Sequence, residues 1–255
     1  MDIISPVYYL AKFWYLLVLP LFGPPGFGVA SGSGLVWKTP AIYRPAGPLL
    51  KSLEVQQRML ATPPGKEAEL VDISGGKLRR CPSDGEGECE TVAVAAFRMD
   101  RTEVTVGRFA QCVKAGKCQA KHFLTFEDTD FCNLGAPGRV EHPINCVAYF
   151  AAKDYCSFAG KRLPSVTEWQ YAARGESDRA YPWGSEEPSC DLATYHGKEG
   201  RACGKMFSVP AKSFPEGASA FGLLGMAGNV MEWTSDIFAP PDDDPEGKRI
   251  PIPDN

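Results

Sequence analysis

The nine cysteines of this 255-residue chain are the feature that most restricts what it can fold into. They stand at Cys81, Cys89, Cys112, Cys118, Cys132, Cys146, Cys156, Cys190 and Cys203, and no two of them form a C-x-x-C pair. A zinc ribbon or a thioredoxin-type redox motif therefore has no support. Several cysteines are separated by only a short stretch of sequence. Such usage is typical of disulfides in an oxidising compartment, and buried reduced cysteines are the alternative. The odd count leaves one cysteine without a partner inside the chain.

The clearest local signal is a short helix beginning after Ser165. The Ser165 hydroxyl can cap the helix, and Glu168, three positions on, can reach back to the Ser165 amide, which makes a capping box. Trp169, Ala172 and Ala173 then fall on one face, and Gly175 supplies a left-handed stop. These agreeing signals predict one complete helix between Ser165 and Gly175.

The composition predicts a folded, loop-rich chain and excludes some partners. The chain has 26 glycines and 22 prolines, with 44% hydrophobic residues, so we expect a core, many loops and few long helices. A net charge of -4 and a pI of about 5.5 argue against a nucleic-acid groove or an anionic membrane surface as the main partner. The three histidines are scattered and form no metal-spaced pair.

Residues 1–30 are mostly apolar and end on Gly28-Val29-Ala30, a small-x-small cleavage signal, before Ser31. We interpret them as an export signal, with a membrane tether as the alternative, because prolines make a spanning helix awkward. The expected location is periplasmic or extracellular. Residues 31–66 are Gly/Pro-punctuated and predict a linker that carries one amphipathic helix between Leu49 and Leu60. The domain is placed at residues 67–238 and an acidic, Pro-rich tail at 239–255.

Further elements are expected within the domain. Strands are predicted at Leu70–Ile73, around Val92 and Val94, and at Phe97–Asp100; helices are predicted from a Thr105 cap to Gly116 and from an Asn145 cap to Gly160; a strand is considered at 228–233. Trp169, Trp183 and Trp233 are expected to pack in the core and not to stack on a substrate.

Five sequence blocks, in this order, point to one family. They are FRMDRTEVTV from Phe97, HPINCV from His142, AGKRLPSVTEWQYAARG from Ala159, YPWG from Tyr181 and MAGNVMEW from Met226. Together they resemble the formylglycine-generating enzyme (sulfatase-modifying factor) family, in particular its cysteine-rich bacterial members. The resemblance runs from about Leu70 to Ser235.

The resemblance implies an α+β fold of the C-type-lectin-like kind, irregular and loop-rich, with few short helices and strands. Active members of the family are copper-dependent oxidases that convert a cysteine in a C-x-P-x-R motif of a sulfatase to formylglycine. A sulfatase-like polypeptide, or another protein or peptide, is therefore the expected partner. Structural calcium ions brace the fold in the family.

The copper site implied by the family has no counterpart among these residues. In the family two cysteine thiolates hold copper after an R-G-G-S-W-like strand, and soft thiolates suit copper(I). None of the nine cysteines matches those two positions, so no residue is assigned a catalytic or copper-binding role. We therefore expect a domain that is incomplete at its C-terminus and inactive as an oxidase.

The resemblance also suggests how the cysteines pair. Cys156 matches a family helix cysteine whose partner lies in the missing last strand, so it is expected to be the odd one. Proximity groups the other eight as Cys81 with Cys89, Cys112 with Cys118, Cys132 with Cys146, and Cys190 with Cys203, although sequence alone does not fix this connectivity.

Two calcium sites carry over in part. Gly228, Val230 and Glu232 match one site, in which backbone carbonyls and a carboxylate supply the hard oxygens that calcium prefers. Asp191 and Leu192 match the start of the other, whose acidic second half is not evident near Cys203, so we expect a Cys190–Cys203 disulfide to replace that ion. Glu103 is a further candidate ligand. The alternative for Glu232 is a buried carboxylate satisfied by an arginine or by backbone amides.

Three hypotheses for function follow. The first is an oxidase of the formylglycine-generating type, which the absent copper cysteines oppose. The second is a non-catalytic, exported binding or structural module on the same fold. The third is a fragment of a longer gene.

Overall fold

The computed structural model describes residues 46–81, 88–119, 123, 132–177, 179–195, 203 and 208–236. The apolar segment 1–30 and the tail 239–255 lie outside these ranges, so the export signal and the domain limits stay predictions. Within the described ranges no helix is both long and apolar enough to cross a membrane.

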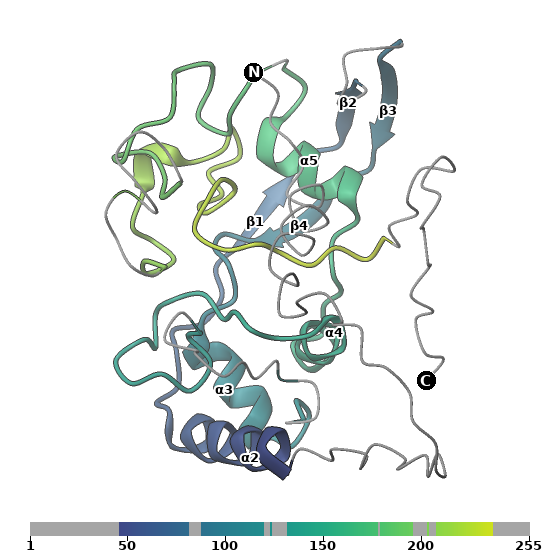
Figure 1. Ribbon diagram of the computed structural model, residues 1–255. Helices are drawn as coiled ribbons and strands as arrows, with labels where there is room; N and C mark the ends of the chain where they lie inside the picture. The colour runs from purple at the N-terminus through teal and green to yellow at the C-terminus, as the bar shows by residue number, and fades with distance from the viewer. Residues whose placement is uncertain are drawn as a thin grey trace, which may run out of the picture.

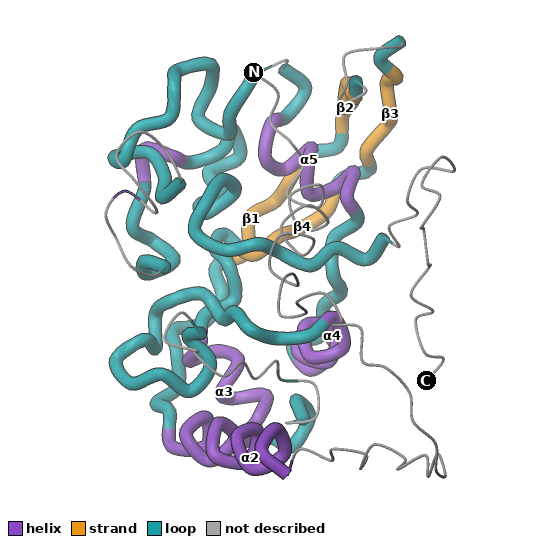
Figure 2. The backbone as a smooth tube through the Cα atoms, in the orientation of Figure 1, coloured by secondary structure: helices purple, strands orange, loops and turns teal. Residues whose placement is uncertain are grey.

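The described chain is a mixed α+β fold, which confirms the expected fold class. Its elements are α2 (Ala46–Ala61), β1 (Leu70–Ile73), β2 (Gly76–Arg80), β3 (Glu90–Val94), β4 (Phe97–Asp100), α3 (Val106–Lys114), α4 (Tyr149–Phe158), α5 (Val166–Arg174) and a 3₁₀ turn at Pro215–Gly217. Long loops join them (Figure 2). Figure 1 shows two groups of elements: α2, α3 and α4 in one, and α5 with the four strands in the other.

The first group encloses a helical core. Met59 of α2 and Phe109 of α3 are almost completely buried, and the Phe109 ring stacks on Tyr155 of α4 with ring centroids 5.9 Å apart. The helix expected between Leu49 and Leu60 is therefore present as α2, and Met59 anchors it to α3. Burying a side chain of this size contributes about 2 kcal/mol.

The second group encloses a smaller core between two antiparallel strand pairs and α5. Strand β1 pairs with β4, and β2 pairs with β3. Ile73, Leu78 and Tyr171 are buried there, together with Leu223 from a loop late in the chain. This core is therefore not complete until the chain returns to it near residue 223.

A buried ion cluster and one extended segment join the two cores. The Asp100 carboxylate of β4 accepts from Arg108 of α3, at 3.2 Å, and from Lys161 of the α4–α5 connection. Segment 229–236 runs between α4 and α5 (Figure 1). On it, Trp233 Nε1 donates to the Val147 carbonyl at 3.0 Å and the Ser235 amide donates to the Pro164 carbonyl at 2.9 Å.

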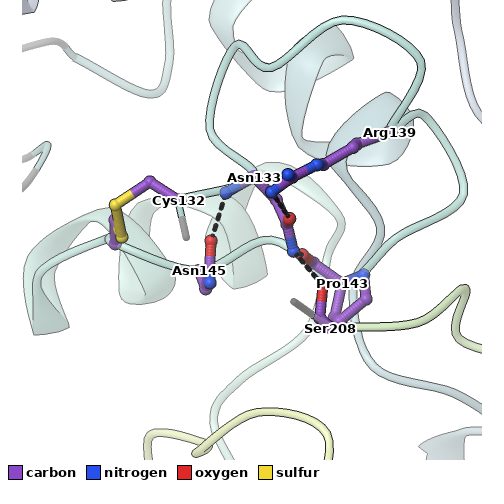
Figure 3. Close-up of a disulfide and its surroundings, with 7 residues drawn as sticks. Cys132, Asn133, Arg139, Pro143, Asn145 and Ser208 are labelled. Carbon is purple, nitrogen blue, oxygen red and sulfur yellow. Dashed lines mark hydrogen bonds between the residues drawn. A yellow bond between two sulfur atoms is a disulfide. The ribbon is translucent and has the colours of Figure 1, made fainter. Parts of the chain in front are cut away.

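The cap predicted for α5 is confirmed, but the cap predicted for α4 is wrong. At α5 the Ser165 hydroxyl accepts from the Glu168 amide and the Glu168 carboxylate accepts from the Ser165 amide. Helix α4 instead begins after Ala148, which has no side-chain cap. Asn145 lies three residues earlier, and its side-chain oxygen accepts from the Asn133 amide (Figure 3). The Asn145 side chain bonds Asn133 instead of capping α4 because Asn133 is completely buried and its backbone amide needs an acceptor.

Asn133 lies beside the Cys132–Cys146 disulfide, and its bonds tie together the α3–α4 connection and join it to the loop that carries Ser208 (Figure 3). Its Nδ2 donates to the Pro143 carbonyl and to Ser208 Oγ, both at 2.7 Å, and its Oδ1 accepts from Arg139 at 2.9 Å. A buried amide with its donors and acceptor satisfied fixes loop geometry where regular secondary structure is absent.

The four expected disulfides are all formed, namely Cys81–Cys89, Cys112–Cys118, Cys132–Cys146 and Cys190–Cys203. Cys156 is the free cysteine.

In the segment after Gly228 the strand that was considered is not formed, and the expectation for Trp233 is wrong. Residues 228–233 form no strand, and Trp233 is 44% exposed instead of packed in the core. The segment makes its hydrogen bonds to helix-flanking loops, so no ladder partner enforces alternation of its side chains. Trp169 and Trp183 are half-buried, and Trp169 packs against the second core as expected.

Candidate cation site

Asn229 is the centre of the candidate site, because its side chain and its backbone hold three distant segments together. Its Nδ2 donates to Glu103 Oε1 at 2.9 Å and its Oδ1 accepts from the Val209 amide at 3.0 Å. Its own amide donates to the Thr194 carbonyl at 3.2 Å and lies 3.1 Å from Thr194 Oγ1. Gly228 and Val230, two of the predicted ligands, are the residues on either side.

The backbone at this point requires the sequence Gly-Asn. Gly228 has φ of 76°, and a Cβ placed on it would lie 1.9 Å from the Thr194 carbonyl oxygen. Asn229 follows with φ of 61°, a left-handed conformation that asparagine tolerates better than most residues. Two successive left-handed residues make a sharp turn between Gly228 and Val230.

Glu103 lies behind this turn, in the loop between β4 and α3. Its side chain is 7% exposed, and its Oε2 has no hydrogen-bond partner in the described part of the chain. Desolvation is the main cause that raises the pKa of Glu103, while the hydrogen bond from Asn229 opposes the rise. The Arg108 guanidinium bonds the Glu103 backbone carbonyl, and its positive charge also opposes the rise in the pKa of the Glu103 carboxyl group.

Glu232 supplies a second carboxyl group near the first. Its Oε2 accepts from Trp169 Nε1 of α5 at 3.2 Å. Glu232 is an exposed residue by its surface area, whereas desolvation is the main influence on the ionisation of its carboxyl group. This desolvation, followed by the negative charge of Glu103, raises the pKa of Glu232 to about 8. The alternative for Glu232 was a carboxylate satisfied by an arginine or by backbone amides. Among the described residues the hydrogen bond to Glu232 comes instead from the Trp169 indole.

The second predicted set, Asp191 and Leu192, lies on a loop that adjoins the first. Asp191 is exposed, and the Cys190–Cys203 disulfide closes the loop beside it. The Leu192 carbonyl oxygen lies so close to Gly217 that a Cβ on Gly217 would be 1.9 Å from it. Thr194, two residues on, contacts Asn229, so the two predicted ligand sets belong to neighbouring loops.

What this arrangement can do chemically follows from its donors. Carbonyl and carboxylate oxygens are hard ligands that suit calcium, and two carboxyl groups of like charge are stabilised by a shared cation. In the described ranges no group of three or more His, Cys, Asp or Glu side chains converges on one point. A cation here would therefore depend on backbone carbonyls as much as on side chains.

The sequence blocks named Glu103 and Glu232 but missed Asn229 and Thr194. Thr194 is 4% exposed and carries no motif signal. The one available signal for Asn229 is an asparagine directly after a glycine, which is typical of a left-handed turn.

The cysteines offer no second candidate site for a metal. Eight are consumed by disulfides, and the Cys156 thiol is half-buried at the end of α4. Desolvation, with Asp100 second, raises the pKa of Cys156 to about 11. A thiol with so high a pKa is protonated at neutral pH, and metals bind the thiolate.

Comparison with known proteins agrees with the sequence blocks. A family model described as the sulfatase-modifying factor enzyme 1-like domain matches residues 56–250, most of the chain. This chain belongs to the sulfatase-modifying factor family. It is 30% identical to the formylglycine-generating enzyme of Mycobacterium tuberculosis, over 68% of this chain and 75% of that protein. It is 34% identical to the formylglycine-generating enzyme of Streptomyces coelicolor, over 69% of this chain and 68% of that protein.

Relatives with other names match a similar share of the chain. The hercynine oxygenase of Mycobacterium tuberculosis is 32% identical over 63% of this chain, which spans 42% of that protein. A Chlamydia trachomatis protein named serine/threonine-protein kinase Pkn1 is 31% identical over 67% of this chain, which spans 28% of it. Sequences similar to this domain thus occur in proteins that carry different names.

Proposed function

We propose that residues 1–255 form a disulfide- and calcium-braced module on the formylglycine-generating enzyme scaffold, without oxidase activity of their own. The cysteine inventory carries this proposal. The resemblance implies that copper(I) is held by two thiolates, whereas four disulfides leave these residues a single thiol with a raised pKa. One protonated thiol does not provide two soft ligands.

Oxidase activity is the rival function, and the relatives named formylglycine-generating enzyme favour it. A binding role is supported by the kinase relative, in which a domain like this one makes up a minor part of a larger protein. In the binding role the partner is a polypeptide, with a sulfatase-like protein as the first candidate.

The two functions are separated by an assay on the copper-treated protein with a C-x-P-x-R peptide. We expect the peptide to keep its thiol, as measured by mass spectrometry and by an aldehyde-reactive probe. The Streptomyces coelicolor relative, treated in parallel, is the positive control. Aldehyde formed above the level of a copper-only blank would overturn the proposal.

The calcium part of the proposal places one ion at the carbonyls of Gly228 and Val230 and the carboxylate of Glu232. Asp191 and Leu192 belong to a second, weaker set that the Cys190–Cys203 disulfide braces in place of further ligands. Support for the first site comes from two acidic groups near it. Glu103 Oε2 is buried without a hydrogen-bond partner among the described residues, and desolvation together with the negative charge of Glu103 raises the pKa of Glu232. The ion supplies bracing charge and takes no part in a reaction.

Thermal unfolding with and without calcium tests this site. A ligand at 100 times its Kd stabilises the native state by about 2.7 kcal/mol, so calcium should raise the Tm by roughly 5 to 10 °C over protein in EDTA. Glu232→Gln should remove most of that rise, whereas Glu67→Gln, at an exposed carboxylate outside both predicted ligand sets, should keep it. An unchanged Tm for the native sequence would dismiss the ion.

Export through residues 1–30 is proposed on the strength of the disulfides, which persist in oxidising compartments. Fusing residues 1–45 to a reporter that is active only outside the cytosol tests it. Reporter activity that disappears when the apolar stretch is deleted is the expected result, and an inactive fusion would contradict export.

A further inference from the structure

Glu103 and Asn229 form the one side-chain bond in the candidate site that reaches across the whole domain. They are 126 residues apart in sequence, and Glu103 Oε1 accepts from Asn229 Nδ2 at 2.9 Å. Their neighbours fix both groups: Arg108 bonds the Glu103 carbonyl, and Val209 bonds the Asn229 amide oxygen. The bond therefore joins the loop that precedes α3 to the loop that carries Gly228, Val230 and Glu232.

The position of the Glu103 carboxyl group is closely defined. A Cβ on Gly225 would lie 2.4 Å from Glu103 Cδ, so the carboxyl group fills the space that a side chain at Gly225 would take. Burial on one side and the Asn229 amide on the other leave the acceptor Oε1 in one place. An acceptor held this firmly is suited to hold a neighbouring loop.

Asn229 transmits that position to the predicted ligands. Its left-handed backbone, with φ of 61°, orients the peptide group that it shares with Gly228 and sets the path of the chain into Val230. Losing the bond from Nδ2 to Glu103 would leave Asn229 attached through Val209 and Thr194 only, and the turn would be free to rotate toward a less strained conformation.

We propose that Glu103 is a positioning residue for the calcium site, holding the ligand loop through Asn229 by the reach of its Oε1 and not by its charge. This inference rests on the proposed calcium site and adds a residue that acts from outside the set of ligands. Partners that orient ligand groups typically change metal affinity by roughly 10- to 100-fold when they are removed.

The experiment separates reach from charge with two conservative variants. Glu103→Gln keeps an acceptor oxygen at the same reach and removes the charge. Glu103→Asp keeps the charge and withdraws the acceptor by one methylene. Calcium affinity is measured by isothermal titration calorimetry on the disulfide-intact chain, and terbium luminescence sensitised by the nearby Trp169 provides a second readout.

We expect Glu103→Gln to bind calcium within about threefold of the native sequence, and Glu103→Asp and Asn229→Ala to bind it roughly tenfold or more weakly. Glu67→Gln, at an exposed carboxylate outside both predicted ligand sets, should bind as the native sequence does. Unfolding curves of each variant in EDTA establish that the ion-free fold is retained, so that a lost affinity is not a lost fold.

Two outcomes would overturn the inference while leaving the calcium site intact. If Glu103→Gln loses affinity and Glu103→Asp retains it, then Glu103 acts on the ion through its charge. If all Glu103 variants bind as the native sequence does, then Glu103 does not position the loop. Absence of binding by the native sequence itself would show as a missing heat in every sample, and it would overturn the calcium site and this inference together.

Discussion

Gly228 and the Thr194 carbonyl oxygen touch so closely that a single methyl group on Gly228 would lie 1.9 Å from that oxygen. Gly228→Ala should therefore destabilise the domain by at least about 2 kcal/mol, through a backbone clash added to the cost of a left-handed alanine. Chemical denaturation under non-reducing conditions measures this. Gly138→Ala is the matched control, since Gly138 has a similar φ of 75° with open space around it, and about 1 kcal/mol is expected there. Equal losses at the two glycines would show that the contact with Thr194 is unimportant.

The buried arginine between the two cores should be far more sensitive than an exposed one. The Arg108 side chain is 6% exposed and bonds Asp100, whereas that of Arg101 is 41% exposed and bonds Glu69. Arg108→Met should cost roughly 3 kcal/mol in the free energy of unfolding, because it leaves a buried carboxylate short of a partner. Arg101→Met should cost less than about 1 kcal/mol. Denaturant midpoints of the two variants decide the matter, and a small loss at Arg108 would mean that Lys161 alone satisfies Asp100.

The capping box of α5 predicts a pH dependence. The hydrogen bond from Arg162 is the main cause that lowers the pKa of Glu168 to about 2, and the Ser165 amide adds to it. A folded-state pKa below the unfolded value gives stability that is present above about pH 4.5 and is lost as the pH falls toward 2. Glu168→Gln should therefore be about 1 kcal/mol less stable at pH 7, with the difference from the native sequence vanishing near pH 2.

Unfolding free energies at several pH values between 2 and 7 check this. Glu187→Gln, at an exposed carboxylate, should show no such closing difference. A difference for Glu168→Gln that stays constant with pH would contradict the role assigned to the charged carboxylate.

Cys156 should be the single thiol that is free without prior reduction of the protein. Under denaturing, non-reducing conditions one thiol per molecule should react with iodoacetamide, and peptide mapping should place the label on Cys156. In the native protein the reaction should be slow at pH 8 and should accelerate toward pH 11, because desolvation raises the pKa of the thiol to about 11. A Cys156 found in a disulfide with one of the other eight would overturn the pairing.

Much of the fold could be predicted where a local signal and the final partner lie close together in sequence. The capping box at Ser165 and Glu168 spans three residues, and the disulfides span between 6 and 14, so nearby residues decide them. The five sequence blocks predicted the family, and membership of that family implied the α+β class.

Where a distant partner decides, the sequence was not sufficient. Asn145 has all the local features of a helix cap, yet the buried Asn133 amide, 12 residues earlier, takes its side-chain oxygen. Thr194 and Asn229 meet only because two loops cross, and no periodicity marks either of them. Trp233 was expected inside, but its indole nitrogen reaches the Val147 carbonyl from an exposed position. The calcium ligands, the export signal and the domain limits stay predictions.

The division into two cores has a consequence for the order in which the chain can assemble during synthesis. Every residue of the helical core lies between Val55 and Ala159, so that core can close while the rest of the chain is still being made. The second core needs Leu223 and Met226, whose side chains pack against strands that are synthesised some 150 residues earlier. A ribosome-bound chain halted before residue 223 should therefore present a finished helical half beside an open strand half, and it is the strand half that a chaperone would have to protect.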